Sequence, residues 1–275
     1  MIVALIFFLV LIGSVIFHIL TPWWWTSVAS NWGSIDDTII LTFWVTGFVF
    51  IAVGLFMVYC IWKFKYKKNR RSEYKPEDSK LEFRLTIITT LGVAALLAPG
   101  LFVWNKYVTV PEDAYQIEVL AYQWAWGYRL PGKDDKLGKT DIKNINDKNP
   151  FGISSRDVNG IDDIVILNEP LHLLKNRPVK VLLRSTDVLH NFYVPQFRGK
   201  MDMLPGSVTY YWFEPIKIGT FEVLCAEFCG TGHYAMRSKV IVNEEKNYNE
   251  WLSKQKTYEQ VISEFSHKPI VKLNK

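Results

Sequence analysis

The sequence contains few cysteines and histidines, and this scarcity excludes several kinds of site. Three cysteines and five histidines occur among its 275 residues. Cys60 lies in an uncharged apolar stretch, where a thiol usually serves as a small hydrophobic side chain, so one pair remains, Cys225 and Cys229. One pair cannot build the disulfide framework of a small secreted domain. No Cys-x-x-Cys-His segment occurs, so we expect no haem on this chain.

Charged residues are absent from three long stretches before residue 110. Each stretch matches the roughly 20 apolar residues that a membrane helix needs. Buried helices of soluble proteins rarely contain such long uncharged runs, and the aromatic content of 15% is typical of membrane interfaces. We therefore expect apolar spans at 1–22, 38–62 and 85–107.

The span at 1–22 leaves two interpretations open. As a secretory signal peptide it lacks the positively charged start, although residues 27–29 resemble a cleavage site. As a retained helix it is longer than an ordinary signal, and the three tryptophans at 23–25 suit an interfacial anchor. The sequence favours the retained helix.

The distribution of basic residues predicts how the chain crosses the membrane. The segment 63–84 is rich in Lys and Arg, whereas residues 21–37 contain neither. Because basic loops stay in the cytoplasm, the part after residue 107 is expected outside. This predicts a protein integral to a bacterial-type inner membrane, in contact with lipid, with its exterior domain on the periplasmic side. The basic loop also accounts for a net charge of +5 without a nucleic-acid partner.

Residues 108–245 have the pattern of an all-β domain. Short apolar runs recur between turn signals at 116–122, 164–167, 179–183, 192–194, 207–213, 221–224 and 238–242. Strands at such spacing are typical of a sandwich or barrel. Trp124, Trp126 and Tyr128 continue the first run at every second position, which predicts three rings on one face of one strand. From the pattern alone, a core aromatic stripe accounts for them.

Two segments depart from the strand pattern. Residues 131–163 are polar, show no regular period and lack the twelve-residue EF-hand pattern, so we expect a surface loop inserted between strands. Residues 246–275 predict a polar helix and a Lys-rich tail. Across 108–245, 16 Lys and Arg compare with 18 Asp and Glu, so this domain is slightly acidic.

The segment from Cys225 to Met236 gathers potential metal ligands, Cys225, Cys229, His233 and Met236, at the spacing C-x3-C-x3-H-x2-M. Thiolates and thioethers are soft ligands that favour copper, and structural zinc sites do not recruit methionine. The flanking runs predict a loop between two strands, which is the setting of blue-copper sites. The second cysteine suggests two metals that share the sulfurs, and the set still lacks one histidine.

His190 is the candidate for the missing ligand, because it follows the strand-like run 179–183. The other histidines fit less well: His18 lies in an apolar span, His172 in an amphipathic stretch and His267 in a polar tail. A disulfide between the two cysteines, or a pair of buried thiols, remains an alternative outside the cytoplasm. Neither alternative explains the neighbouring histidine and methionine.

At these residues the chain resembles subunit II of the haem–copper cytochrome c oxidases, which carries the dinuclear CuA centre. The matching pieces are CAEFCGTGHYAM at 225–236, DVLH at 187–190, VP at 194–195, MDMLPG at 201–206 and QWAWGY at 123–128. The resemblance implies two or three membrane helices and an all-β exterior domain folded as a Greek-key cupredoxin-like barrel. The usual family pattern has two membrane helices, so the span at 1–22 is a departure.

The resemblance also implies the roles of the ligands. Cys225 and Cys229 would bridge two coppers, and His190 and His233 would each cap one of them. Met236 would be a weak ligand.

Two glutamates acquire roles from the same resemblance. Glu227 would bind copper weakly through its backbone carbonyl, and its carboxylate would reach a magnesium ion shared with the catalytic subunit. Glu82, at the edge of the last span, matches the position from which protons pass into the catalytic subunit. An isolated glutamate at a membrane edge is otherwise simply solvated.

The resemblance assigns the contacts with cytochrome c to another set of residues. Electrons would enter at Trp124, with Trp126 and Tyr128 as docking or supporting aromatic residues. Asp187 matches a docking position, although its neighbour, often acidic in the family, is Thr186 here. Docking in the family relies on electrostatic attraction, so the small acidic surplus favours a less basic donor or aromatic contacts.

The implied function is that of the electron-accepting subunit of a haem–copper terminal oxidase. Electrons from cytochrome c pass to haem in catalytic subunit I, where oxygen is reduced to water with coupled proton movement. The other oxidase subunits complete the set of partners. Three alternatives remain: a quinol oxidase subunit, which would lack the ligands; a CuA-bearing subunit of a nitric or nitrous oxide reductase; and a copper-delivery protein with exposed ligands.

Overall fold

The computed structural model describes residues 2–21, 26–71 and 73–266. The chain forms two compact units, one made of Met1–Thr26 with Ser34–Trp104, the other of Ser27–Gly33 with Asn105–Lys275. We call the second unit the β domain. The tryptophans at 23–25 and the end of the predicted Lys-rich tail, 267–275, lie outside the described residues.

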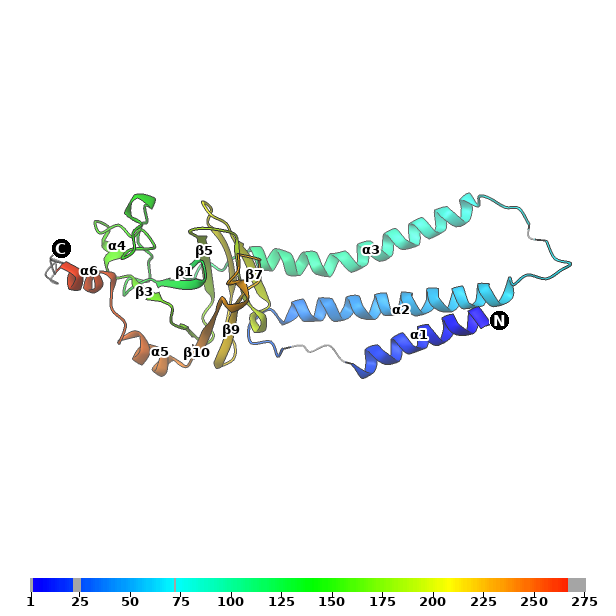
Figure 1. The fold of residues 1–275 in the computed structure, drawn as a ribbon, viewed down its shortest axis with the longest axis horizontal. Coiled ribbons are helices and arrows are strands. Elements are labelled where there is room, and N and C mark those ends of the chain that lie inside the picture. The colour runs from blue at the N-terminus through cyan, green and yellow to red at the C-terminus, as the bar shows by residue number, and fades with distance from the viewer. Residues whose placement is uncertain (1, 22–25, 72, 267–275) are drawn as a thin grey trace. The chain divides into compact units, whose positions relative to one another are not determined.

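The first unit is helical (Figure 1). Helices α1 (Ile2–Leu20), α2 (Gly33–Lys63) and α3 (Ser79–Val108) are each long and apolar enough to cross a membrane, and an 18-residue stretch of each has a mean hydropathy of 2.9, 2.4 and 2.0, respectively. α2 and α3 begin before the apolar runs that predicted them. With a rise of about 1.5 Å per residue, a helix of 31 residues is longer than the roughly 30 Å hydrocarbon layer, so its ends continue through polar residues.

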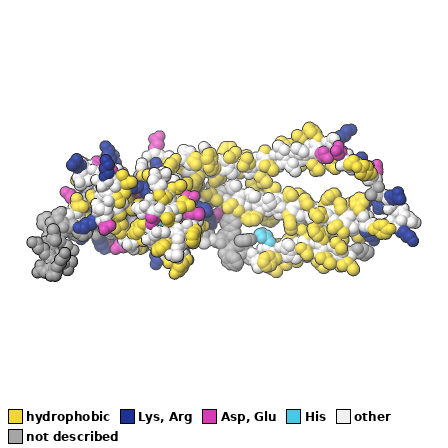
Figure 2. Space-filling model, turned by 45° about the horizontal axis from the view of Figure 1, so that its top comes forward, with side chains coloured by type: hydrophobic (Ala, Val, Ile, Leu, Met, Phe, Trp, Pro, Cys, Tyr) yellow, Lys and Arg dark blue, Asp and Glu magenta, His cyan; other side chains and the backbone are white. Residues whose placement is uncertain are grey.

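The surface of these helices is hydrophobic. Trp44, Phe48 and Phe102 are among the most exposed aromatic side chains, at 77%, 73% and 73%. Figure 2 shows hydrophobic side chains along the helices and basic side chains on the segment that joins α2 to α3. Exposed aromatic and aliphatic side chains in such number suit contact with lipid or with other membrane helices.

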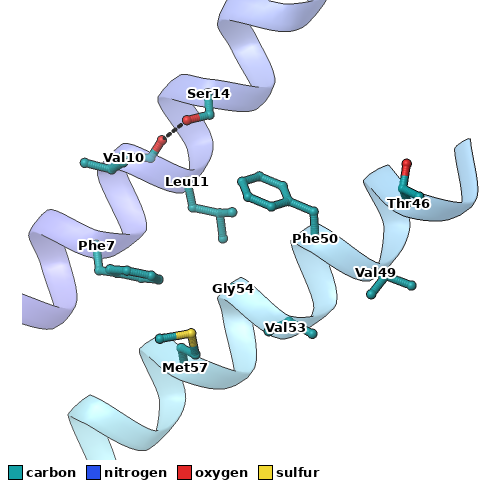
Figure 3. A pocket seen from close by; sticks show the side chains of 10 residues that line it. All are labelled: Phe7, Val10, Leu11, Ser14, Thr46, Val49, Phe50, Val53, Gly54 and Met57. Atoms are coloured by element: carbon teal, nitrogen blue, oxygen red, sulfur yellow. Dashed lines mark hydrogen bonds between the residues drawn. The ribbon is translucent and has the colours of Figure 1, made fainter. Parts of the chain in front are cut away.

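α1 packs against α2 at a glycine. Leu11 of α1 is buried, and a Cβ atom added at Gly54 of α2 would lie 2.8 Å from the Cδ1 atom of Leu11. Small residues let membrane helices approach closely. Figure 3 shows the pocket beside this contact, of about 450 Å³, with Phe7, Phe50 and Met57 in its lining. α1 therefore has a packing partner inside its own unit.

The β domain is a sandwich of two five-stranded sheets, with strand orders β3-β2-β1-β5-β8 and β4-β10-β9-β6-β7 (Figure 1). The strands are β1 Tyr115–Tyr122, β2 Ala125–Leu130, β3 Ile164–Leu167, β4 Leu171–Leu174, β5 Val179–Ser185, β6 His190–Val194, β7 Gly199–Met203, β8 Thr209–Phe213, β9 Gly219–Cys225 and β10 Arg237–Asn243. β1 pairs with β5 in parallel, as β10 does with β4, and the remaining pairs are antiparallel.

The predicted fold class, apolar helices with an all-β domain, is confirmed. Alternation places Ile117, Val119, Val181 and Leu183 in the core, all with 0% exposure, because successive side chains of a strand point to opposite faces. The strands form two separate sheets rather than one closed barrel, an arrangement consistent with a cupredoxin-like fold. β4 and β7 were not predicted, because the sequence Leu-His-Leu-Leu hardly alternates and β7 begins with glycine and contains two charged residues.

The segment before α2 also belongs to the β domain. Ala29 and Trp32 are buried, and the Trp32 indole donates to the carbonyl of Trp212 at 2.9 Å. The N–H of Ala29 donates to the carbonyl of Gln196, and its own carbonyl accepts from Ile216. Ala29, the last of the residues that resemble a cleavage site, is therefore packed against the β domain, whereas Ser27 is exposed.

The prediction that three aromatic rings share one strand face was wrong. β1 ends at Tyr122 and β2 begins at Ala125, so Trp124 lies in the turn between them. Trp126 and Tyr128 are buried on β2, whereas Trp124 is 41% exposed. The two-residue connection of an antiparallel hairpin interrupts the strand. The alternation of aromatic residues continues through this turn, so the sequence pattern did not reveal the interruption.

The insertion at 131–163 is a folded segment rather than a simple surface loop. It contains a 3-10 turn at Ile142–Asn144 and the short helix α4, Val158–Ile161. Phe151 and Ile153 are buried in a cluster with Leu120 of β1 and Tyr258. Tyr258 begins α6 (Tyr258–Ser266), which follows α5 (Glu245–Leu252) in the expected helical tail. The apolar residues of this stretch show no regular period, so the sequence did not predict which of them are buried.

A buried ionic network closes the insertion onto the first sheet. The Arg129 guanidinium lies 2.8 Å from Glu118 and 3.1 Å from Asp163, and all three side chains are at most 4% exposed. Arg129 also donates to the carbonyl of Gly138, and Arg184 contacts Glu118. Two guanidinium groups face two carboxylates, so the desolvated charges are balanced, as buried charges require.

The packing of the insertion predicts the effect of Phe151→Ala. Removal of a fully buried ring should cost about 3–5 kcal/mol of unfolding free energy, which lowers the unfolding midpoint of the β domain by about 6 °C or more. Thermal unfolding of the detergent-solubilised chain, followed by near-UV circular dichroism, measures this. Ile142→Ala, at a side chain that is 80% exposed, is the control and should change little. Equal unfolding midpoints for Phe151→Ala and Ile142→Ala would contradict the burial of Phe151 in the core of the β domain.

Candidate metal centre

The predicted ligands come from two segments that the second sheet brings together. Cys225 ends β9, and Met236 directly precedes β10, so the loop between two paired strands carries the thiols. His190 is the first residue of β6. In the antiparallel pairing of β6 with β9, Phe192 lies opposite Cys225, which brings the start of β6 to the cysteine loop.

Six potential donor atoms converge at this place. The sulfurs of Cys225 and Cys229 are 3.7 Å apart, and each faces one imidazole: His190 Nδ1 is 3.9 Å from Cys225, and His233 Nδ1 is 3.7 Å from Cys229. The other two donors are the Met236 sulfur, 3.8 Å from that of Cys229, and the Glu227 carbonyl, 3.2 Å from that of Cys225.

The sulfur separation is that of two free thiols rather than of a disulfide. A disulfide bond is about 2.05 Å long, whereas these sulfurs are 3.7 Å apart and both cysteines are free. His190, Cys225 and Cys229 form the one group of potential metal-binding His, Cys, Asp and Glu side chains found in the described part of the chain, with ligand atoms within 4.8 Å of one another. Thiols, imidazoles and a thioether in one cluster fit copper.

Four of the six donor residues are buried, whereas His233 and Glu227 are half-buried. His190 is 0% exposed, Met236 1% and Cys229 3%, and Cys225 is also buried. Burial favours neutral thiols, but hydrogen bonds from His190 and from the backbone of Glu227 and Asn191 lower the pKa of Cys225 to about 6. Burial, together with the adjacent Cys225 sulfur, raises the pKa of Cys229. One thiol is therefore prepared to lose its proton, and the second needs a cation to do so.

Asp187 orients the first imidazole. Its carboxylate lies 2.8 Å from His190 Nε2 and accepts the backbone N–H groups of Val188 at 2.7 Å and Gln123 at 2.6 Å. Burial would raise the pKa of Asp187, but these hydrogen bonds lower it; burial would lower the pKa of His190, but contacts with Cys225 and Asp187 raise it. A carboxylate on the second nitrogen fixes the ring so that Nδ1 faces the sulfur.

This role of Asp187 was missed by the sequence reasoning, which placed it only at a docking position. The signal was present in the spacing Asp-x-x-His, which lets one side chain reach the other across a tight turn. The Asp187 side chain is 29% exposed, so part of it still faces the surface.

The three predicted aromatic residues occupy different environments. Trp124 is partly exposed, and its indole N–H donates to the Cys229 carbonyl at 3.2 Å. Trp126 is buried and packs edge-on against Phe192 with ring centroids 5.5 Å apart. Tyr128 is also buried. Trp126 and Tyr128 therefore support the core beneath the centre and offer no surface to a docking partner.

The two predicted glutamates belong to different units of the chain. Glu227 is half-buried within the metal loop, and its carbonyl faces Cys225. Glu82 lies in the first turn of α3, in the helical unit, and is exposed. The magnesium role of Glu227 and the proton role of Glu82 stay predictions.

Comparison with known proteins gives a consistent result. Residues 115–244 match the family model of the cytochrome c oxidase subunit II periplasmic domain. The chain is 59% identical over 258 residues to the alternative cytochrome c oxidase subunit 2 of Bradyrhizobium diazoefficiens, covering 94% of this chain and 93% of that protein. It is 28% identical over 233 residues to cytochrome c oxidase subunit 2 of Cereibacter sphaeroides, covering 78% and 77%.

Among solved structures, the periplasmic domain of subunit II of cytochrome oxidase (CoxB) of Bradyrhizobium japonicum aligns with a TM-score of 0.39 and 24% identity. This alignment covers 53% of this chain and 95% of that one. The extent and identity of the match to the Bradyrhizobium diazoefficiens protein decide the assignment. The chain belongs to the cytochrome c oxidase subunit II family.

Proposed function

We propose that the six-donor cluster holds a dinuclear copper centre and that cytochrome c supplies its electrons. The chain is the electron-accepting subunit of a haem–copper terminal oxidase, as its family membership indicates. One observation carries the proposal: two sulfurs 3.7 Å apart, each facing its own imidazole, form a nearly symmetric pair of half-sites. A mononuclear copper site needs one thiolate and both histidines around it.

A copper pair bound between these sulfurs would supply one-electron acceptance and release, with the charge change spread over two metals. The residues of the chain provide a fixed and dry setting. Strands hold His190 and Cys225, and Asp187 orients the first imidazole. Burial keeps water away from the sulfurs. Fixed ligands that need little rearrangement suit electron transfer rather than conversion of a substrate.

Trp124 supports the second part of the proposal. It is the partly exposed aromatic residue whose indole donates to the carbonyl of Cys229, so it joins the protein surface to a ligand-bearing residue through one hydrogen bond. The acidic surplus of residues 108–245 is small, which suits a less basic cytochrome c or one held by aromatic contacts. Electrons from that donor would enter the protein at the indole.

The partners follow from the family. Other oxidase subunits, including a catalytic subunit, complete the complex, and the sequence predicts no haem on this chain. We place the β domain on the periplasmic side of a bacterial inner membrane, with 63–84 in the cytoplasm and lipid around the helices, because of the basic loop. Glu227 is proposed to reach a magnesium ion at the catalytic subunit, and Glu82 to serve proton uptake there.

The alternatives receive less support. Relatives that match most of the chain are named as oxidase subunits, which favours oxygen over nitrogen oxides as the final acceptor. A quinol oxidase subunit would lack the six donors found here. A copper-delivery protein would need most of its ligands within reach of a recipient, whereas His190, Cys229 and Met236 are at most 3% exposed and only the His233 side of the ligand set is half-buried.

The proposed function is tested by native purification of the complex from membranes. We expect the chain to co-purify with a haem-containing catalytic subunit that consumes oxygen when reduced cytochrome c is supplied. Oxygen consumption with quinol alone, or reduction of nitric or nitrous oxide instead of oxygen, would contradict the assignment.

The sulfur pair predicts the effect of single serine substitutions. Cys225→Ser and Cys229→Ser should each abolish the EPR signal of a dinuclear copper centre, because the proposed pair of coppers would share both sulfurs, which are 3.7 Å apart. Cys60→Ser, which changes a thiol of α2 outside the cluster, is the matched control and should keep the signal. Survival of the dinuclear signal in either variant of the loop would refute shared sulfurs.

Met236 predicts a milder effect. Because a thioether is a weak and tuning ligand, Met236→Leu should retain copper and shift its midpoint reduction potential. Redox titration of the EPR signal measures the shift. Met201→Leu on β7 serves as the control, with no shift expected. A potential equal to that of the wild type would remove Met236 from the ligand set.

Trp124 predicts a kinetic effect. Trp124→Ala should slow electron uptake from reduced cytochrome c by about 10-fold or more, equal to about 1.4 kcal/mol in the barrier, while the ligands remain in place. Stopped-flow reduction and copper analysis measure both quantities. Tyr210→Ala, an exposed aromatic residue of β8, is the control. If Trp124→Ala accepted electrons at the wild-type rate, Trp124 would not be the residue at which electrons enter.

A further inference from the structure

The turn formed by Gln123 and Trp124 contacts both segments that carry ligands. The Gln123 side-chain amide donates to the carbonyl of Cys229 at 2.9 Å, within the metal loop. The backbone N–H of the same residue donates to the Asp187 carboxylate at 2.6 Å. One residue is thus bonded to the loop between β9 and β10 and to the turn that precedes β6.

The second of these bonds leads directly to a ligand. Gln123 donates to Oδ2 of Asp187, whereas Oδ1 of that carboxylate lies 2.8 Å from His190 Nε2. The two oxygens therefore have separate partners. Gln123 fixes the orientation of the carboxylate, and the carboxylate fixes the imidazole.

The glycines of the metal loop show how closely the turn lies against it. A Cβ atom added at Gly230 would be 3.0 Å from Gln123 Nε2, and one added at Gly232 would be 2.3 Å from Trp124 Cδ2. Gly230 also has a φ of +116°, which favours glycine. At Gly232 a side chain of any size would push the indole away from the loop.

We propose that Gln123 is a positioning residue for the metal centre, holding the Cys229 side of the loop and the His190 side together through its amide and its backbone N–H. This inference rests on the proposed copper function. It also assigns Gly232 the role of leaving room for the Trp124 indole, which donates to the same Cys229 carbonyl. The turn therefore connects the two half-sites.

Exposure alone would assign Gln123 another role. The residue lies at the surface beside Trp124, where a docking contact with the electron donor would also be expected. The two roles differ in what they change. Substitution of a docking residue changes the KM for cytochrome c. Substitution of a positioning residue changes the retention and the EPR spectrum of the bound copper, even when no electron donor is present.

The test substitutes Gln123→Leu in the complete oxidase complex, which removes the amide donor and leaves a branched apolar side chain one atom shorter. Loss of a group that orients ligands typically weakens metal binding by about 10–100-fold, so copper should be lost to a chelator at least about 10-fold faster. The copper hyperfine splitting in the EPR spectrum should change, and the KM for cytochrome c should not. Gln116→Leu, an exposed glutamine of β1, is the matched control and should match the wild type in all three.

Gly232→Ala tests the connection between the two half-sites by a second route, because the added methyl group displaces the indole rather than removing a donor. It should also accelerate copper loss and change the hyperfine splitting. Wild-type copper retention and splitting in Gln123→Leu, with or without a raised KM, would overturn the proposal. Absence of a dinuclear signal from the wild-type complex would overturn the proposed function, a result distinct from an unaltered variant.

Discussion

The metal centre depends on the antiparallel register between β6 and β9. Phe192 lies opposite Cys225, and the N–H of Ala226 donates to the Asn191 carbonyl at 3.2 Å just beyond the paired residues. This register brings His190 to the point at which the chain leaves β9. A shift by one residue would turn the imidazole to the other face of the sheet, because side chains alternate along a strand.

The two half-sites are held by different means. On one side, His190 and Cys225 lie at the ends of paired strands, and Asp187 fixes the imidazole. On the other side, Cys229 and His233 lie in a loop with two glycines and one short 3-10 turn, His233–Ala235. The loop gains its rigidity from outside, through the hydrogen bonds that the turn between β1 and β2 makes to the Cys229 carbonyl. Both sheets of the sandwich therefore take part in one centre.

Much of this arrangement could be predicted from the sequence, because the residue types were specific. Thiol, imidazole and thioether at short spacing indicated the metal loop, and alternation indicated most strands. The structure brings His190 to that loop, although 35 residues separate it from Cys225. The helices were evident from the absence of charge, and only their polar ends were missed.

What could not be predicted depended on contacts between distant segments. Trp124 was expected on a strand with Trp126, because a two-residue turn leaves the spacing of aromatic residues unchanged. The insertion was expected to be a surface loop, because its sequence is polar and shows no regular period. The burial of Phe151 could not be seen there, since it depends on contact with α6, about a hundred residues later. The spacing of Asp187 and His190 allowed a contact between them, but the turn that aims the carboxylate at Nε2 was not specified by the sequence.

The central claim is that the two sulfurs hold two metals that act as one centre. The most direct measurement is the copper content of the purified complex, combined with the number of copper nuclei that couple to the unpaired electron in its EPR spectrum. The account predicts two coppers at this site and hyperfine coupling to both. One copper at this site with coupling to a single nucleus would contradict it, since a mononuclear centre needs one thiolate and leaves the second sulfur without a role.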